Sequence, residues 1–355
     1  MTNWVGIRLE QLDTLFFRDG RPFTATDKAH SRDIPMPQTI AGALRSRIME
    51  SLGCDFGRSN GEDKKIIREV MNEASIRGPW FVKGDQMLFA TPATIVEESP
   101  DSTRADPALD MLRPCKKEIP GWRNTELKYP LWRRSITPAR RHSSRFITFK
   151  GMKSFLSGNL PDNKEFVKAE DVFGFDRRTG IEIDSESLTA ADSKIYGASM
   201  LSLKDDVRLY VEVSAREEWI AKSFSAKNTG LLKLGGEGRY VRTELMKKPL
   251  LEFGSSLSPS GGGAMHVLLT PALFGGWKPA GHGDQPVCAS VPGYEAVSGW
   301  DLAKGGPKPA RFAVSAGSIY FMDRAPEAGK IGSLCTGEDA RLGYGIYAEG
   351  RFDYV

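Results

Sequence analysis

Two short glycine-rich stretches predict the architecture of this 355-residue sequence: LGGEGRYV at residues 234–241 and RLGYGIYA at residues 341–348. Each places closely spaced glycines before a run of β-prone residues. Each also lies near the end of a strand-rich stretch, residues 4–245 and residues 264–355. This repetition predicts two copies of one structural unit, with the first copy enlarged by insertions. Between the copies, the glycine- and serine-rich residues 254–263 predict a linker or loop.

Local patterns around these stretches indicate mixed α and β structure. Residues 4–12 alternate like a strand, and residues 38–52 form an apolar helix face with Ile40, Leu44 and Ile48. Residues 13–37 predict a long loop, and a loop of this length inside a compact domain is usually functional or mobile. We expect further helices at 63–75, 148–159 and 215–226, and strands at 80–82, at 87–89 and, as a pair, between 195 and 213.

Composition excludes several classes of protein. The hydrophobic fraction of 40% and the charged fraction of 26% are typical of a globular chain, and the length predicts one large or two medium domains. Residues 1–10 have no signal-peptide core, and no apolar run is long enough to span a membrane. The four cysteines are scattered, which excludes a disulfide scaffold and a Cys-x-x-Cys site and favours a cytoplasmic location.

The positive charge is concentrated in residues 113–153, which we call the basic segment. The whole chain has a net charge of only +4, yet this segment contains twelve basic and two acidic residues. Such concentration favours a polyanion-binding surface. Aromatic residues interleave with the cations, as in proteins that bind single-stranded nucleic acid: Trp122, Tyr129, Trp132, Phe146 and Phe149. The alternative is a solvated loop with a few aromatic side chains in the core.

The glycine stretch at 234–241 is not a nucleotide-binding P-loop, because no Gly-Lys-Ser/Thr follows it. Its glycines allow the backbone to approach a bulky ligand, and Arg239 and Arg242 add charge. The alternative is a tight turn between a helix and a strand.

The sequence offers little for catalysis. The four histidines, His30, His142, His266 and His282, lack metal-ligand spacing, so we expect neither a metal ion nor another cofactor. No serine nucleophile elbow is present. The acidic residues between 162 and 176 alternate with lysine and arginine, which predicts a solvated face. His30 or His142 remains a candidate general acid or base for RNA cleavage.

Several motifs in this order resemble the third subunit of the Cmr complex, the type III-B CRISPR effector. That family belongs to the repeat-associated mysterious protein (RAMP) superfamily, and the similarity extends from about residue 4 to residue 352. The motifs are LDTLFFRDGRPF at 12–23, PMPQTIAGALR at 35–45, RTGI at 178–181, KIYG at 194–197, SGWD at 298–301, PKP at 307–309, AGSIY at 316–320 and GYG at 343–345.

The resemblance implies an α+β fold of two ferredoxin-like (RNA-recognition-motif-like) units with a basic inserted thumb. The units would comprise residues 1–248, with the basic insertion at about 97–160, and residues 249–355. It further implies a non-catalytic subunit that binds the 5′ handle of the CRISPR RNA. The implied partners are CRISPR RNA, target RNA, the large polymerase/cyclase-like subunit and the backbone RAMP subunits.

Three groups of residues are the candidate RNA contacts. Arginine suits this role because its planar fork pairs with phosphate and stacks on bases. The alternative role of Arg18 and Arg21 is to brace the N-terminal loop through Asp13 or Asp19. Residues 298–301 and 307–309 belong either to a partner interface or to the second core. The contacts are Arg18, Arg21 and Arg45 near the N-terminus; Gly235, Gly236, Gly238 and Arg239 in the glycine stretch; and Arg133, Arg134, Arg140, Arg141 and Arg145 in the basic segment.

Three other functions stay open at this point. The first is a metal-independent endoribonuclease of the same superfamily that processes precursor CRISPR RNA with His30 and a lysine. The second is a handle-binding subunit of another type III subtype. The third is a protein-only scaffold in which the basic segment merely keeps the chain soluble.

Overall fold

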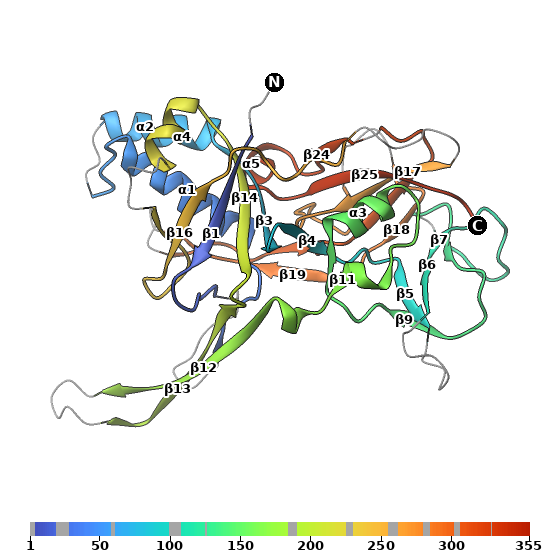
Figure 1. The fold of residues 1–355 in the computed structure, drawn as a ribbon, viewed down its shortest axis with the longest axis horizontal. Coiled ribbons are helices and arrows are strands. Elements are labelled where there is room, and N and C mark those ends of the chain that lie inside the picture. The colour runs from blue at the N-terminus through green and yellow to red at the C-terminus, as the bar shows by residue number, and fades with distance from the viewer. Residues whose placement is uncertain are drawn as a thin grey trace. The chain divides into compact units, whose positions relative to one another are not determined.

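The structure, a computed structural model, is of mixed α/β type with mostly antiparallel sheets and few helices (Figure 1). It divides into two compact units, each made of three chain segments. The first unit comprises Met1–Gly84, Glu170–Pro249 and Ala296–Arg311, and the second comprises Asp85–Ala169, Leu250–Glu295 and Phe312–Val355. The structure describes residues 4–18, 28–57, 61–98, 108–124, 126–183, 190–224, 230–254, 262–279, 285–301, 306–327 and 329–355.

The first unit is built on the antiparallel strand order β3-β14-β1-β16-β15. Strand β1 lies at its centre and pairs with β14 on one side and β16 on the other. The elements are β1 Val5–Gln11, β2 Lys28–His30, α1 Pro37–Ser51, α2 Gly61–Glu73, β3 Ser75–Lys83, β12 Phe173–Ile183, β13 Ala190–Leu203, β14 Val207–Ser214, α4 Glu217–Phe224, β15 Leu231–Lys233, β16 Tyr240–Leu245, β20 Trp300–Asp301 and β21 Gly306–Pro307.

The core of the first unit follows from the alternation in β1 and the apolar face of α1. Ile7 and Leu9 point from β1 into this core, while Ile40 and Leu44 enter it from α1, all of them fully buried. Pro37 occupies the first turn of α1, where its fixed φ favours helix initiation. Helices α1, α2 and α4 lie together beside the sheet in Figure 1. The predicted strand at 4–12 and the helices at 38–52, 63–75 and 215–226 are confirmed, with ends shifted by one or two residues.

The longest element of the first unit is the hairpin β12–β13. Its ten paired positions run from Phe173 opposite Leu203 to Ile183 opposite Ala190. In Figure 1 its two strands extend together away from the sheet. Two strands between residues 195 and 213 were predicted and are confirmed as the end of β13 and β14. The prediction of a solvated face up to residue 176 missed β12, because its charged positions hide the alternation of Phe173 and Phe175.

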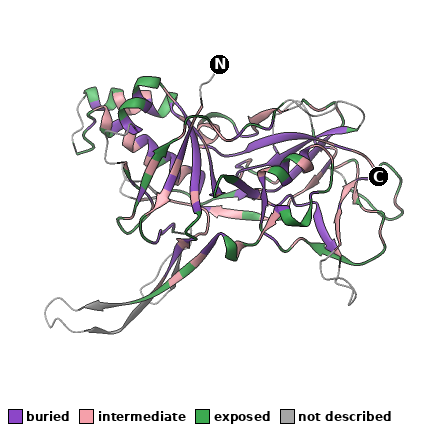
Figure 2. Ribbon diagram, in the orientation of Figure 1, coloured by how far each residue is buried: buried purple, intermediate pink, exposed green. Residues whose placement is uncertain are grey.

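The second unit is built on two sets of strands, β18-β23-β17-β25-β24 and β11-β10-β4. Strand β17 is buried along its whole length (Figure 2). The elements are β4 Gln86–Ala90, β5 Ile95–Glu98, β6 Leu109–Met111, β7 Arg113–Pro114, β8 Leu131–Trp132, β9 Ala139–Arg141, β10 Phe146–Thr148, α3 Phe149–Leu156, β11 Phe166–Val167, β17 Gly263–Leu268, β18 Cys288–Ser290, β23 Ile319–Met322, β24 Ile331–Ser333, α5 Gly337–Leu342 and β25 Ile346–Phe352; β19 Tyr294–Val297 and β22 Arg311–Val314 cross the boundaries between units.

The basic insertion expected at 97–160 lies within the segment Asp85–Ala169 of the second unit. Its described part contains two small sheets, β6-β5-β9 and β7-β8, followed by β10 and α3. Phe146, Met152 and Phe155 at its end are buried in the second unit. Thr148 caps α3 by accepting a hydrogen bond from the backbone N–H of Gly151. The end of the insertion is therefore part of the core of the second unit, whereas the longest hairpin among the described residues is β12–β13.

Both glycine stretches lead into strands, as expected. The first precedes β16 of the first unit, and the second precedes β25 of the second unit. Gly343 ends α5 in the left-handed conformation, with φ of 98°. The expected division at residue 248 lies beside the boundary between Pro249 and Leu250. The units nevertheless exchange further segments, since Asp85–Ala169 belongs to the second unit, and no local pattern signals that exchange.

Candidate nucleic-acid interface

The glycine stretch packs against the N-terminal segment of the chain. Gly235 has φ of 81°, and a Cβ there would lie 2.5 Å from the carbonyl oxygen of Phe16. The backbone N–H of Gly236 donates to that same oxygen at 2.9 Å. The space around Gly238 is open, although its φ is also positive. Gly235 and Gly236 thus allow the backbone to approach the protein itself, which favours a tight turn for these two residues. The turn joins two strands, β15 and β16, rather than a helix and a strand as the alternative expected.

The same N-terminal segment fastens the base of the β12–β13 hairpin. Leu15 and Leu201 exchange two backbone hydrogen bonds of 2.8 Å each. The side chain of Gln11 accepts from the backbone N–H of Leu203, also at 2.8 Å. Four stretches of the chain, 11–18, 173–178, 198–203 and 234–239, therefore meet at this place, which we call the hairpin base.

Asp13 links two arginines at the hairpin base. Its carboxylate pairs with Arg239 and lies 3.6 Å from Nη2 of Arg178, which also pairs with Asp176 at 2.8 Å. The N–H of Thr14 donates to the Asp13 carboxylate, and this bond together with the two arginines lowers the pKa of Asp13. The carboxylate is therefore ionised at neutral pH and holds the two arginines.

The hairpin base also presents an aromatic ring beside its cations. Phe175 is 44% exposed and packs edge-on against the buried Phe173, with ring centroids 5.7 Å apart. Arg177 lies two residues further along β12 and is exposed, as is Arg178. An exposed aromatic ring can stack on a base, and arginine side chains on the same hairpin can pair with a phosphate. The prediction of a solvated face passed over these residues; the alternation Phe173-x-Phe175-x-Arg177 is the signal that would have found them.

The predicted contacts near the N-terminus have separate environments. Arg18 is exposed at the end of the N-terminal segment and forms an isolated bridge with Ser31. Arg21 lies outside the described residues. Arg45 is only 2% exposed, because its Nε and Nη2 donate to the carbonyl oxygen of Ala74 at 3.3 and 2.9 Å. Arg45 therefore joins α1 to the residue that follows α2.

Acidic residues neutralise part of the basic segment. Arg133 pairs with Glu98 and Asp110 at 3.2 and 3.3 Å, and Arg140 pairs with Glu97 at 2.6 Å. These acids lie just outside the segment in sequence, so local counting overstates its free charge. Arg134, Arg141 and Arg145 are exposed.

The aromatic residues of the basic segment have two kinds of environment. Trp122 and Trp132 are 37% and 47% exposed and are available for stacking. Phe146 is 1% exposed, and Phe149 stacks on Phe253 with ring centroids 4.8 Å apart. Tyr129 packs edge-on against Tyr354. The segment thus combines the two alternatives, a polar surface with two exposed rings and an aromatic contribution to the core.

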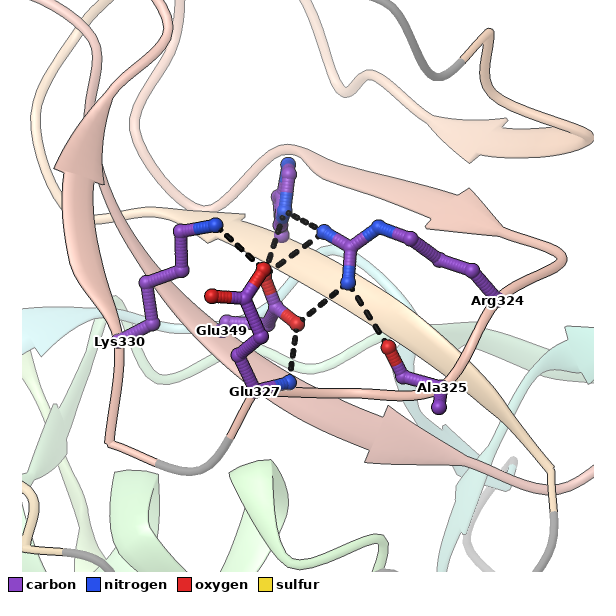
Figure 3. A network of polar contacts seen from close by, with 6 residues as sticks. Arg324, Ala325, Glu327, Lys330 and Glu349 are labelled. Carbon is purple, nitrogen blue, oxygen red and sulfur yellow. Dashed lines mark hydrogen bonds and ion pairs between the residues drawn. The ribbon is translucent and has the colours of Figure 1, made fainter.

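The described histidine side chains have structural partners. His266 is 8% exposed and its Nε2 lies 3.0 Å from the carboxylate of Glu349, which also pairs with Arg324 (Figure 3). His142 stacks on Phe166 with ring centroids 4.2 Å apart. The side chain of His30 lies outside the described residues. Among the described residues, no group of three or more His, Cys, Asp or Glu side chains is placed to hold a metal ion.

The stretch at 298–301 and 307–309, with its short ribbon β20–β21, belongs to the first unit. Gln38 at the start of α1 donates from Nε2 to the carbonyl oxygen of Ser298 at 2.7 Å, and Arg32 donates to that of Ala296.

No described helix is long and apolar enough to cross a membrane.

Comparison with known families defines the class of this protein. A family model described as CRISPR-associated protein (Cas_Cmr3) matches residues 7–351. The chain is therefore a CRISPR-associated protein of the RAMP-type Cmr subunits. It belongs to the Cas_Cmr3 family.

Solved structures share the fold at low sequence identity. A chain in the cryo-EM structure of the Type III-B Cmr-beta bound to cognate target RNA and AMPPnP (state 1) is 17% identical, with a TM-score of 0.53 over 89% of this chain and 86% of that one. A chain in the corresponding structure bound to cognate target RNA is 18% identical, with a TM-score of 0.52 and the same coverage. No curated protein matches the chain significantly.

Proposed function

We propose that this chain is a non-catalytic subunit of a cytoplasmic type III-B CRISPR effector and binds the 5′ handle of the CRISPR RNA. Its role is positional, since it fixes where the guide begins. In this proposal each of the two units has a ferredoxin-like fold, and each corresponds to one of the two copies that the glycine-rich stretches predict. The chain docks on the large polymerase/cyclase-like subunit and on backbone RAMP subunits, which carry the catalytic activities.

The observation that carries this proposal is the hairpin base in a member of the Cas_Cmr3 family. There, Arg177, Arg178 and the exposed ring of Phe175 lie on the hairpin β12–β13, and Arg239 shares the Asp13 carboxylate with Arg178. We therefore propose that the inserted thumb implied by the resemblance is the hairpin β12–β13 rather than the basic segment. An RNA strand would place phosphates on the arginines and a base on Phe175.

The test is purification of the native complex from its host at modest salt, followed by sequencing of bound RNA and identification of bound proteins. The proposal expects short RNAs that share one repeat-derived 5′ end, together with a large cyclase-like partner. The double variant R177Q/R178Q should lose RNA while keeping its folding stability, because both side chains are exposed. The matched control is K64Q/K65Q, which removes two exposed charges on α2.

Two outcomes would contradict the proposal. A protein that carries neither RNA nor partners would be a scaffold or would act outside such a complex. A protein that cleaves repeat RNA by itself in the presence of a chelator would be a processing endoribonuclease, and the variant H30A would then abolish cleavage.

A further inference from the structure

A row of side chains crosses four strands on one face of the sheet in the first unit. Glu10 of β1 lies opposite Arg242 of β16 in the register, and Arg242 lies opposite Leu231 of β15, the last of the described strands on this side. Arg208 of β14 extends the row in the other direction, because its Nη2 donates to the carboxylate of Glu10 at 2.8 Å. Side chains that are opposite each other in an antiparallel pair share one face of the sheet.

This face is open to solvent. Leu231 is 40% exposed, and the side chain of Arg242 is 61% exposed. Leu232 and Val241, which adjoin these two residues in sequence, are opposite each other and buried, because side chains alternate between the two faces along a strand. Helices α1 and α4 contact β15 and β16 and so cover the buried face.

An exposed aromatic ring lies beside the row. Tyr240 precedes Arg242 by two residues on β16, so both point to the open face, and Tyr240 is 47% exposed. Lys233 of β15 lies opposite Tyr240 and is also exposed. Side chains placed opposite each other have Cβ atoms about 5 Å apart, so the ring has a lysine beside it on the next strand. We call this surface the open sheet face, defined by Glu10, Arg208, Leu231, Lys233, Tyr240 and Arg242.

Glu10 holds the two arginines of the open sheet face without cancelling their charge. Arg208 and Arg242 donate to different oxygens of its carboxylate, at 2.8 and 3.0 Å. A shared carboxylate restricts both guanidinium groups, so less side-chain entropy remains to be lost on binding. Glu244, further along β16, lies opposite Arg8, and this pair adds no net charge. The two arginines and one lysine of the open sheet face outnumber its single carboxylate, which favours an anionic ligand.

We infer that the open sheet face binds single-stranded RNA, with one base stacked on Tyr240 and the neighbouring phosphates on Arg242 and Lys233. The choice of RNA rests on the proposed function. The open sheet face continues the hairpin base, since the glycine stretch there leads through Arg239 directly into Tyr240. An exposed ring set among cations can stack on any base while the cations follow the phosphate backbone.

The test measures binding of a labelled single-stranded RNA to the full chain over a range of salt concentrations. The variant Y240A should weaken binding about tenfold, the effect of losing one stacked base, whereas Y240F keeps the ring and should bind like the wild type. The variant R242Q should reduce the slope of log K against log salt by about 0.7, the value for one phosphate on a single strand. All three variants should unfold at the same urea concentration as the wild type, because both side chains are exposed.

Two control variants separate a specific contact from general properties of the surface. Y294A removes a tyrosine of β19 that is 73% exposed, and K64Q removes an exposed lysine of α2. Losses of affinity in these controls equal to those of Y240A and R242Q would overturn the inference. Unchanged binding by Y240A together with a loss in R177Q/R178Q would overturn the inference and leave the proposed function standing. If neither variant binds more weakly, both fail.

Ultraviolet cross-linking of the wild-type chain tests the same contact without a substitution. RNA that contains thiouridine should attach to the peptide that includes Tyr240, as identified by mass spectrometry, and cross-links confined to other peptides would overturn the inference. If Y240A binds RNA like the wild type but no longer copurifies with another subunit, the open sheet face is a protein interface and the RNA assignment is wrong.

Discussion

Asp13 of the first unit and Glu349 of the second unit each hold cationic side chains, but they differ completely in burial. The side chain of Glu349 is 0% exposed and forms two bonds to Arg324, at 2.7 and 2.9 Å, and one to His266 at 3.0 Å. The side chain of Asp13 is 55% exposed, and its partner Arg178 is 45% exposed.

This difference separates charges used for folding from charges available to a ligand. Because Glu349 is desolvated, the folded state is stable only when its charge is paired. Removing one partner would leave the other as an unpaired charge in the protein interior. The exposed Asp13 gains little from its pair with Arg178, whose guanidinium also remains open to solvent. The same contrast runs through the basic segment, where Arg140 is bound to the buried Glu97 while Arg141 is not.

The largest expected effect is the loss of stability in E349Q. The amide lacks the charge that Arg324 requires, and it keeps only one of the two oxygens that accept from Arg324, His266 and the backbone N–H of Glu327. We expect the free energy of unfolding in urea to fall by about 3–5 kcal/mol. The control E338Q removes a half-exposed partner of Arg341 and should cost less than about 1 kcal/mol. Equal losses in the two variants would remove the contrast between buried and exposed carboxylates.

Acid should lower the stability of the protein by protonating Glu349. Burial alone would raise the pKa of Glu349, but hydrogen bonds from Arg324, His266 and the N–H of Glu327 lower it from 4.5 to about 2. A depressed native pKa adds stability above the unfolded pKa, and this stability disappears as the pH falls from about 4.5 to about 2. The contribution is about 3 kcal/mol. Urea unfolding near neutral pH and at about pH 3 should show most of this loss, and the profile of E349Q should be flatter.

An intermediate effect is expected at the hairpin base in G235A. The alanine would need a left-handed backbone, and its Cβ would lie 2.5 Å from the Phe16 carbonyl oxygen. We expect a loss of about 2–3 kcal/mol in the free energy of unfolding. The control G238A has a similar φ of 62° but nothing within 4 Å of the added Cβ, so it should lose only about 1 kcal/mol. A cost for G238A equal to that of G235A would show that packing against Phe16 contributes nothing.

The sequence predicts the local elements well, because their signals are local. The strand alternation predicts that Ile7 and Leu9 are buried, and both are buried in β1. The helical spacing predicts the same for Ile40 and Leu44, which are buried in α1. The glycine stretches also lead into strands as expected. The motif order pointed to the Cas_Cmr3 family, which the family match confirms.

The candidate site was less predictable, because its electrostatics depend on contacts between distant residues. Counting charges favoured Arg133 and Arg140, whose acidic partners are 35 and 43 residues away in sequence. Arg45 looked available on a helix, yet it is buried against Ala74. Arg178 gains its role only when β12 meets Asp13, a contact that no local pattern encodes.

The smallest expected effect on stability is that of D13N, and it is also the most informative for binding. The exposed ion pairs of Asp13 contribute little, so the free energy of unfolding should fall by less than about 1 kcal/mol. Under the proposed function, the carboxylate competes with phosphate for Arg178 and Arg239. Its removal should therefore tighten RNA binding a few-fold at low salt, and the gain should vanish at high salt because screening weakens exposed charges. Weaker binding by D13N would instead mean that Asp13 orients the two arginines toward the RNA. Under conditions in which E349Q remains folded, its affinity for RNA should equal that of the wild type. Asp13 would then affect RNA binding and Glu349 only stability.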